Sequence, residues 1–241
     1  MSIQERSVSE RVAPRERLPS APPATAEFPA WVFADRTELA NTITHGLGFA
    51  VSLIAAWYLI GVAAQTADAW RIAACTIYAV SLAAVYAAST LSHLFHQPGL
   101  RRFFRKLDQG LIYFLIAGTF TPFGLVFLRG GWWIAILAVM WGVALWAFFV
   151  KLAYGHRLEQ VSISACLILG WLPVASTPPL SGMLPANCFW IMMAGGLAYS
   201  IGTVFLLCDA RHWFFHATWH LFVIAGSALH YWAILHYVAR A

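Results

Sequence analysis

The chain has 241 residues, of which 61% are hydrophobic and only 10% are charged. A soluble domain is about 45–50% apolar and about 25% charged, so this composition excludes a water-soluble globular surface and indicates an integral membrane protein. The net charge of +5 does not indicate a nucleic-acid partner, because the main basic run, Arg101–Lys106, is short and better explained by membrane topology.

The N-terminal segment differs in composition from the rest of the chain. It contains five arginines and a proline- and alanine-rich run, Pro19–Ala30. An apolar stretch of the kind found in a cleavable signal peptide does not follow the early arginines. We therefore predict a disordered cytoplasmic tail over residues 1–37 and a single membrane domain over residues 38–241.

Seven apolar stretches of about 20 residues, the length that a helix needs to cross a bilayer, follow this tail. They are continuously apolar, whereas the strands of a membrane barrel alternate over about 10 residues. The fifth stretch is the weakest, because Pro173, Pro178 and Pro179 interrupt it. We predict an all-α, polytopic bundle of seven transmembrane helices. The predicted spans are Asn41–Ala64, Ile72–Phe95, Gln109–Leu128, Trp132–Val150, Val161–Leu180, Cys188–Leu207 and Phe215–Val238.

The distribution of lysine and arginine predicts the orientation of the bundle, because these residues accumulate on the cytoplasmic side of membrane proteins. With seven crossings, 12 of the 15 lysines and arginines fall on the side of the N-terminus. The other side holds only Arg71, Arg129 and Arg240. We therefore predict a cytoplasmic N-terminus and an external C-terminus.

Several polar side chains fall at the same predicted depth, near the cytoplasmic side. His93 lies near the end of the second stretch, Asp108 opens the third, and His216 and His220 begin the seventh. His216 and His220 are four residues apart and therefore share a helical face, as do Ser89 and His93. Two imidazoles on adjacent helical turns can chelate one metal ion. Ionisable groups at membrane depth are rare and usually functional.

Three histidines with an open fourth position are the ligand set of a catalytic zinc site, whereas structural zinc sites are closed and usually contain cysteine. We therefore predict that His93, His216 and His220 bind Zn²⁺. Bound zinc lowers the pKa of its water to about 7. Asp108 would offset the charge of the ion and hold this water through a hydrogen bond, rather than act as a fourth ligand. Ser89 would bind the water or a developing oxyanion.

Structural interpretations stay open beside this one. Asp108 could instead cap a helix or pair with Arg105 or Lys106. The four cysteines lack the spacing of metal or disulfide motifs and are interpreted as small packing residues. Glu38, Asn41 and His45 add polar groups to the same end, at helical spacing. A lone histidine in a membrane helix usually bonds a neighbouring helix or faces a wet cavity. That interpretation applies to His45, His96, His156, His212, His230 and His236.

At these residues the sequence resembles hemolysin III, the bacterial branch of the progestin and adipoQ receptor family. The resemblance covers about residues 36–241 and implies seven helices with one zinc ion near the cytoplasmic face. It implies His93, His216 and His220 as ligands, with Ser89 and Asp108 beside them. It also implies location in the bacterial inner membrane. The matching segments are Glu38–Gly48, Ser89–His93, Asp108–Phe123, Gly195–Gly202 and His216–Val223, followed by Gly226, Ser227 and His230.

Three functions are compatible with these predictions. The first is a zinc-dependent hydrolase of a lipid amide or ester, because the resemblance extends to alkaline ceramidases. The second is a receptor or membrane-homeostasis protein with a structural zinc ion. The third is a cytolytic pore, the activity for which bacterial members of the family are named. The third is the least favoured, because a channel needs a polar lining and the predicted helices carry no continuous polar stripe. The sequence identifies neither the lipid nor the oligomeric state.

Overall fold

A computed structural model describes residues 36–154, 163–176 and 179–240 of the chain. These residues form seven α-helices and, within the described ranges, no β-strand. Nearly all of the predicted tail lies outside the described residues. The helices are α1 (Arg36–Ala64), α2 (Ala69–Leu94), α3 (Pro98–Val126), α4 (Gly131–Tyr154), α5 (Ile163–Ala175), α6 (Ala186–Leu207) and α7 (Phe215–Ile234).

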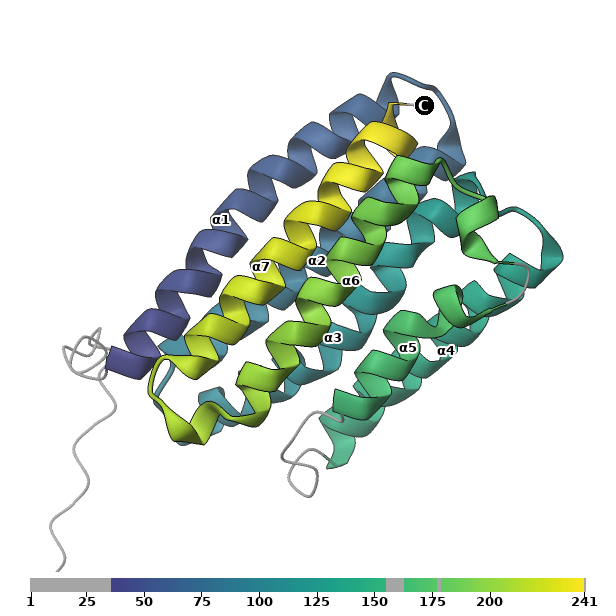
Figure 1. The fold of residues 1–241 in the computed structure, drawn as a ribbon. Coiled ribbons are helices and arrows are strands. Elements are labelled where there is room, and N and C mark those ends of the chain that lie inside the picture. The colour runs from purple at the N-terminus through teal and green to yellow at the C-terminus, as the bar shows by residue number, and fades with distance from the viewer. Residues whose placement is uncertain (1–35, 155–162, 177–178, 241) are drawn as a thin grey trace, which may run out of the picture. The chain divides into compact units, whose positions relative to one another are not determined.

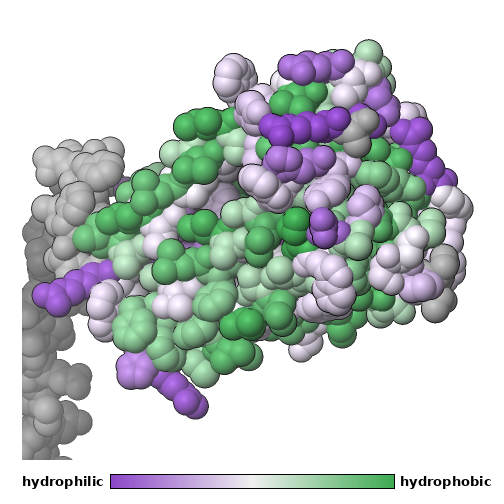
Figure 2. All heavy atoms as spheres, turned by 45° about the horizontal axis from the view of Figure 1, so that its top comes forward, coloured by the Kyte–Doolittle hydropathy of each residue, from purple (hydrophilic) through white to green (hydrophobic). Residues whose placement is uncertain are grey.

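Six of these helices, all except α5, are long and apolar enough to cross a membrane. Large hydrophobic side chains stand exposed along their flanks, including Trp57, which is 79% exposed, and Trp146, which is 67% exposed. Figure 2 shows hydrophobic side chains over the flanks, with hydrophilic ones gathered toward the end where α1 turns into α2. A surface of this kind requires a hydrocarbon environment. The prediction of a multi-pass, all-helical membrane protein is therefore confirmed.

The fifth predicted span, Val161–Leu180, is not a single long helix. The described helix α5 has 13 residues and ends at Ala175, and a short 3₁₀ turn follows at Leu180–Gly182. Prolines 178 and 179 stand between these elements in the sequence and cannot donate the backbone hydrogen bonds that continue a helix. The apolar composition predicted the location of this segment correctly but overestimated the length of its helix.

The third helix begins earlier than predicted. It starts at Pro98, a residue type favoured in the first turn, rather than at Gln109. Its first turns carry the basic residues Arg101, Arg102, Arg105 and Lys106, which are helical but not apolar. A hydropathy pattern therefore could not detect them. Asp108 consequently lies inside α3, and the alternative interpretation of Asp108 as a helix cap is wrong.

Consecutive helices run antiparallel, and α7 packs against both α1 and α6 (Figure 1). This arrangement brings the start of α1, the end of α2 and the start of α3 together. Glu38 of α1 contacts both His93 of α2 and Arg101 of α3. At the opposite end, Arg129 after α3 pairs with Asp68 before α2, with an N–O distance of 3.2 Å. The start of α1, the end of α2 and the start of α3 therefore lie at one end of the bundle, as the predicted metal site requires.

Glycines allow close packing between α6 and α7. A Cβ atom at Gly202 would lie 2.6 Å from the Cβ atom of Phe222 and 2.8 Å from the Trp219 ring. At Gly196 a Cβ atom would lie 3.6 Å from the Trp171 ring, an ordinary contact. Gly202 is therefore a point of close approach, whereas Gly196 has room for a methyl group.

We expect Gly202→Ala to destabilise the protein by about 1–3 kcal/mol, because the added methyl group forces α6 and α7 apart. The matched Gly196→Ala variant should be neutral or slightly stabilising, because alanine is the better helix former. Thermal unfolding of the two purified variants in detergent measures the difference. Equal melting temperatures would contradict the close approach at Gly202.

Candidate metal centre

The structure brings His93, His216 and His220 into one cluster. Each offers a ring nitrogen, and these nitrogens all lie within 4.8 Å of one another. The ring centroids are 4.8–5.3 Å apart. His93 and His220 are buried, and His216 is half-buried. We call these three side chains the histidine trio.

Local structure explains how the trio forms. His93 lies in the last turn of α2, which ends at Leu94. His216 is the second residue of α7, and His220 follows one turn later on the same face. Because α2 and α7 end and begin at the same end of the bundle, their polar termini meet there. The predicted proximity of the three histidines is therefore present in the structure.

Each member of the trio has its Nδ1 atom beside an oxygen atom. For His93 the oxygen is Oε2 of Glu38 at 2.7 Å, and for His216 it is Oδ2 of Asp209 at 3.5 Å. For His220 it is the hydroxyl of Thr44 at 3.0 Å. Metal-binding histidines almost always donate their other ring N–H to a carboxylate, a carbonyl or water in this way.

The partners of Thr44 are compatible with a metal-binding tautomer of His220. The Thr44 hydroxyl has one proton, and it donates that proton to the backbone carbonyls of Ala40 and Asn41 at 2.9 and 3.0 Å. With its proton on one of these carbonyls, the hydroxyl can accept a hydrogen bond from Nδ1–H of His220, a tautomer that leaves the Nε2 lone pair free to bind a metal. The side chains present therefore fit a metal ion, such as zinc, bound through one ring nitrogen of each histidine.

We expect Glu38→Gln to weaken zinc binding about 10–100-fold, because the amide no longer orients and polarises His93 as the carboxylate does. The control is Asp68→Asn, which removes a carboxylate at the opposite end of the bundle and should leave the affinity unchanged. Competition with a fluorescent chelator measures both dissociation constants. An unchanged value for Glu38→Gln would show that the contact with His93 does not support metal binding.

Asp108 and Ser89 lie beside the trio but are not part of its group of ligand atoms. The Asp108 carboxyl interacts with the Ser89 hydroxyl and lies near the charge of Arg105. Lys106 instead donates a hydrogen bond to the backbone carbonyl of Leu152 at 3.4 Å. Both Ser89 and Asp108 line the same cavity as the trio. This placement fits a carboxylate that acts next to a bound ion rather than on it.

Sequence reasoning did not assign roles to several residues of this centre. The sequence predicts Glu38 and His45 only as polar groups at the same end, and it assigns nothing to Thr44 or Asp209. His45 stacks on His220 with ring centroids 3.6 Å apart, and neither of its ring nitrogens has a hydrogen-bond partner. The spacing of Glu38, Asn41 and His45 was a usable signal, because it places all three on one face of α1.

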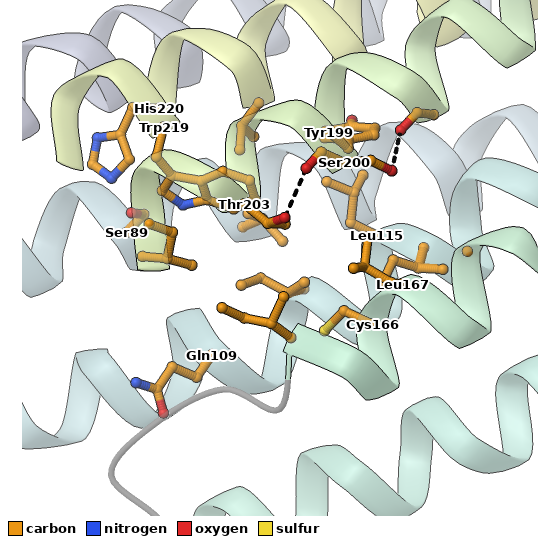
Figure 3. A pocket seen from close by; sticks show the side chains of 18 of the residues that line it. Ser89, Gln109, Leu115, Cys166, Leu167, Tyr199, Ser200, Thr203, Trp219 and His220 are labelled. Carbon is orange, nitrogen blue, oxygen red and sulfur yellow. Dashed lines mark hydrogen bonds between the residues drawn. The ribbon is translucent and has the colours of Figure 1, made fainter. Parts of the chain in front are cut away.

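A cavity of about 660 Å³ extends from the histidine trio into the bundle. Its walls come from six helices, α1, α2, α3, α5, α6 and α7, together with Met140 of α4. Figure 3 shows His220, Trp219 and Ser89 at one end of this cavity and Tyr199 and Ser200 at the other. The volume falls within the range of about 300–1,000 Å³ that is typical of small-molecule sites.

Fold and site together define a multi-pass helical membrane protein with a largely buried histidine trio at one end of an internal cavity. Residues 33–231 match the family described as Haemolysin-III related, and the chain belongs to this family. It is 40% identical over 205 residues to Hemolysin-3 of Bacillus cereus, which covers 84% of this chain and 92% of the relative.

Two further relatives are a second bacterial protein and a human protein. The Hemolysin-3 homolog of Bacillus subtilis (strain 168) is 36% identical over 209 residues, covering 87% of this chain and 98% of the relative. The human Monocyte to macrophage differentiation factor is 30% identical over 188 residues, covering 72% of this chain and 74% of the relative. No solved structure gives a significant match.

Proposed function

We propose that this protein is a zinc-dependent hydrolase that cleaves an amide or ester bond of a membrane lipid. The observation that carries the proposal is the histidine trio at the end of a lipid-sized cavity, with an oxygen atom beside every Nδ1. In the proposed centre each histidine offers one ring nitrogen to the ion, and the fourth position holds water on the side of the cavity that Asp108 also lines. A closed structural site would have a fourth protein ligand in that position.

A zinc ion held by the trio would supply a water molecule that is already activated at neutral pH. Asp108 takes the proton of the attacking water and returns it to the leaving nitrogen or oxygen of the lipid. Ser89 donates a hydrogen bond to the oxygen that gains negative charge. The apolar walls of the cavity exclude bulk water and hold the hydrocarbon chain of the substrate in line with these groups.

The proposed location is the bacterial inner membrane, with the histidine trio near the cytoplasmic face. The excess of lysine and arginine at this end of the bundle supports this orientation. A cysteine introduced at Arg102 should then react with a membrane-impermeant maleimide only after the cells are opened, whereas one introduced at Trp132 should react in intact cells. The reverse pattern would overturn the proposed orientation.

The proposal is tested on wild-type protein purified in detergent without added metal. Elemental analysis should find about one zinc per chain, and the protein should release fatty acid from a ceramide or another lipid amide or ester. Removing zinc with a chelator should stop this release, and adding zinc should restore it. Protein that contains no zinc and cannot take it up would exclude the proposed centre. Bound zinc without turnover of any lipid would exclude the hydrolase.

A second candidate is a non-catalytic membrane protein in which zinc is structural. The trio joins α2 to α7, and its oxygen partners belong to α1 and to the turn before α7. An ion there would tie these elements together. A cytolytic pore is the third candidate, and the names of the two Bacillus relatives, which refer to haemolysis, support it. Conductance of the purified protein in lipid bilayers would distinguish this candidate from the other two.

A further inference from the structure

The cavity has a second polar wall that the proposed reaction does not use. His220 and His230 both line the cavity. They are ten residues apart on α7, which corresponds to about 15 Å along the helix axis. Apolar side chains such as Leu115, Leu167 and Val223 also line it. A ligand that extends from the histidine trio along this cavity therefore meets hydrocarbon walls and then His230.

His230 is held in place but lacks a hydrogen-bond partner. Its side chain is only 7% exposed, and its Nδ1 atom has no partner. The ring stacks on Tyr199 with centroids 5.6 Å apart and an interplanar angle of 15°. The ring also packs tightly against α6 at Gly195, where a Cβ atom would lie 2.7 Å from Nε2 of His230. Buried polar atoms without partners are uncommon, and each one points to a missing partner or a functional role.

Three hydroxyl groups near His230, those of Tyr86, Tyr199 and Ser227, carry one proton more than the hydrogen bonds among them use. Tyr86 donates to the Ser227 hydroxyl at 3.0 Å, and the Tyr199 and Ser227 hydroxyls are 2.8 Å apart. These three hydroxyls share two hydrogen bonds but carry three protons. When Ser227 donates to Tyr199, the proton of Tyr199 is left over. Of these three residues, only Tyr199 lines the cavity.

We propose that Tyr199 and His230 form a second subsite, which hydrogen-bonds a hydroxyl group partway along the hydrocarbon chain of the ligand. With Ser227 as the donor to Tyr199, a ligand hydroxyl can accept from Tyr199, and it can donate to a ring nitrogen of His230 or accept from it. The low exposure of this wall disfavours a charged group, because burying an unpaired charge is costly. The inference rests on the proposed function only for the position of the ligand's polar end, at the histidine trio.

The test compares binding of oleate and ricinoleate, two fatty acids of equal length that differ by a mid-chain hydroxyl, to the purified full-length protein. Wild type should bind ricinoleate about tenfold more tightly, the value of one hydrogen bond. Tyr199→Phe removes only the hydroxyl and should reduce this preference to near unity. The matched control is Tyr231→Phe. Tyr231 bonds the backbone of Ala55 at 3.0 Å and does not line the cavity, so this variant should keep the preference.

Equal affinity of wild type for the two fatty acids would overturn the subsite, as would a preference that survives in Tyr199→Phe. Failure of wild type to bind either fatty acid would also overturn it. Zinc content and lipid hydrolysis are measured on the same samples. A protein without zinc or turnover that still prefers ricinoleate refutes the proposed function and leaves the subsite standing. A protein with both that shows no preference refutes the subsite alone.

Discussion

Replacing His220 with alanine is expected to reduce the zinc content of the purified protein from about one ion per chain to near zero. His220 is 1% exposed, and its Nδ1 atom lies 3.0 Å from the Thr44 hydroxyl, so its Nε2 atom is the one available to the proposed ion. Losing one of three protein ligands should weaken binding by more than the roughly 10–100-fold expected for an outer partner such as Glu38. Elemental analysis after gel filtration measures the loss.

The matched control is His236→Ala. His236 lies beyond the last turn of α7, at the far end of the bundle, where its ring packs on Trp232. This variant should keep its zinc. If His220→Ala keeps a full zinc ion while remaining folded, the histidine trio is not the metal site. If both variants lose zinc, the loss reflects general unfolding, which the melting curves of the two proteins would reveal.

The second large effect is expected for Asp108→Asn, which should keep its zinc but lose hydrolysis. Asparagine has nearly the same shape as aspartate but cannot accept the proton of the attacking water. General base catalysis contributes about 10²–10⁴-fold to a rate, so the loss should fall in that range. Because Asp108 is not among the grouped ligand atoms, the zinc content should stay near one per chain.

This variant also separates the first two candidate functions. A protein with a structural zinc ion should tolerate Asp108→Asn in every functional assay, whereas a hydrolase should not. The control is again Asp68→Asn, whose carboxylate accepts hydrogen bonds from the backbone at the start of α2. Full hydrolytic activity in Asp108→Asn would eliminate Asp108 as the base. Loss of zinc in the same variant would instead identify Asp108 as a ligand.

The sequence predicted the parts of the structure that depend on composition and on the alternating direction of successive membrane crossings. Long apolar stretches gave the helices, and the alternation of their direction placed His93 near His216 and His220. The four-residue spacing of the latter two was enough to put them on one face. None of these inferences required knowledge of side-chain packing, because the bilayer limits a spanning segment to a small set of lengths and directions.

Other features could not be predicted in the same way. The first turns of α3 are basic, so an apolar pattern misses them although they are helical, and Asp108 was therefore placed at a helix start. The helix α5 ends at Ala175, although the predicted span continued to Leu180, because the end of a helix depends on backbone hydrogen bonds and not on apolar composition alone. The contacts from Glu38, Thr44 and Asp209 to the trio depend on the rotation of α1 and the path of the turn before α7. Neither is encoded by hydropathy.

The division of the histidine trio between α2 and α7 has a consequence for biogenesis. His93 enters the membrane early in translation, together with Glu38 and Thr44 on α1, but His216 and His220 follow only with the final helix. Until α7 inserts, Glu38 can pair with His93 and Arg101, but Thr44 and His93 lack their contacts with the histidines of α7. A chain that terminates before α7 therefore retains the polar groups of α1 and α2 without the side chains that complete the cluster.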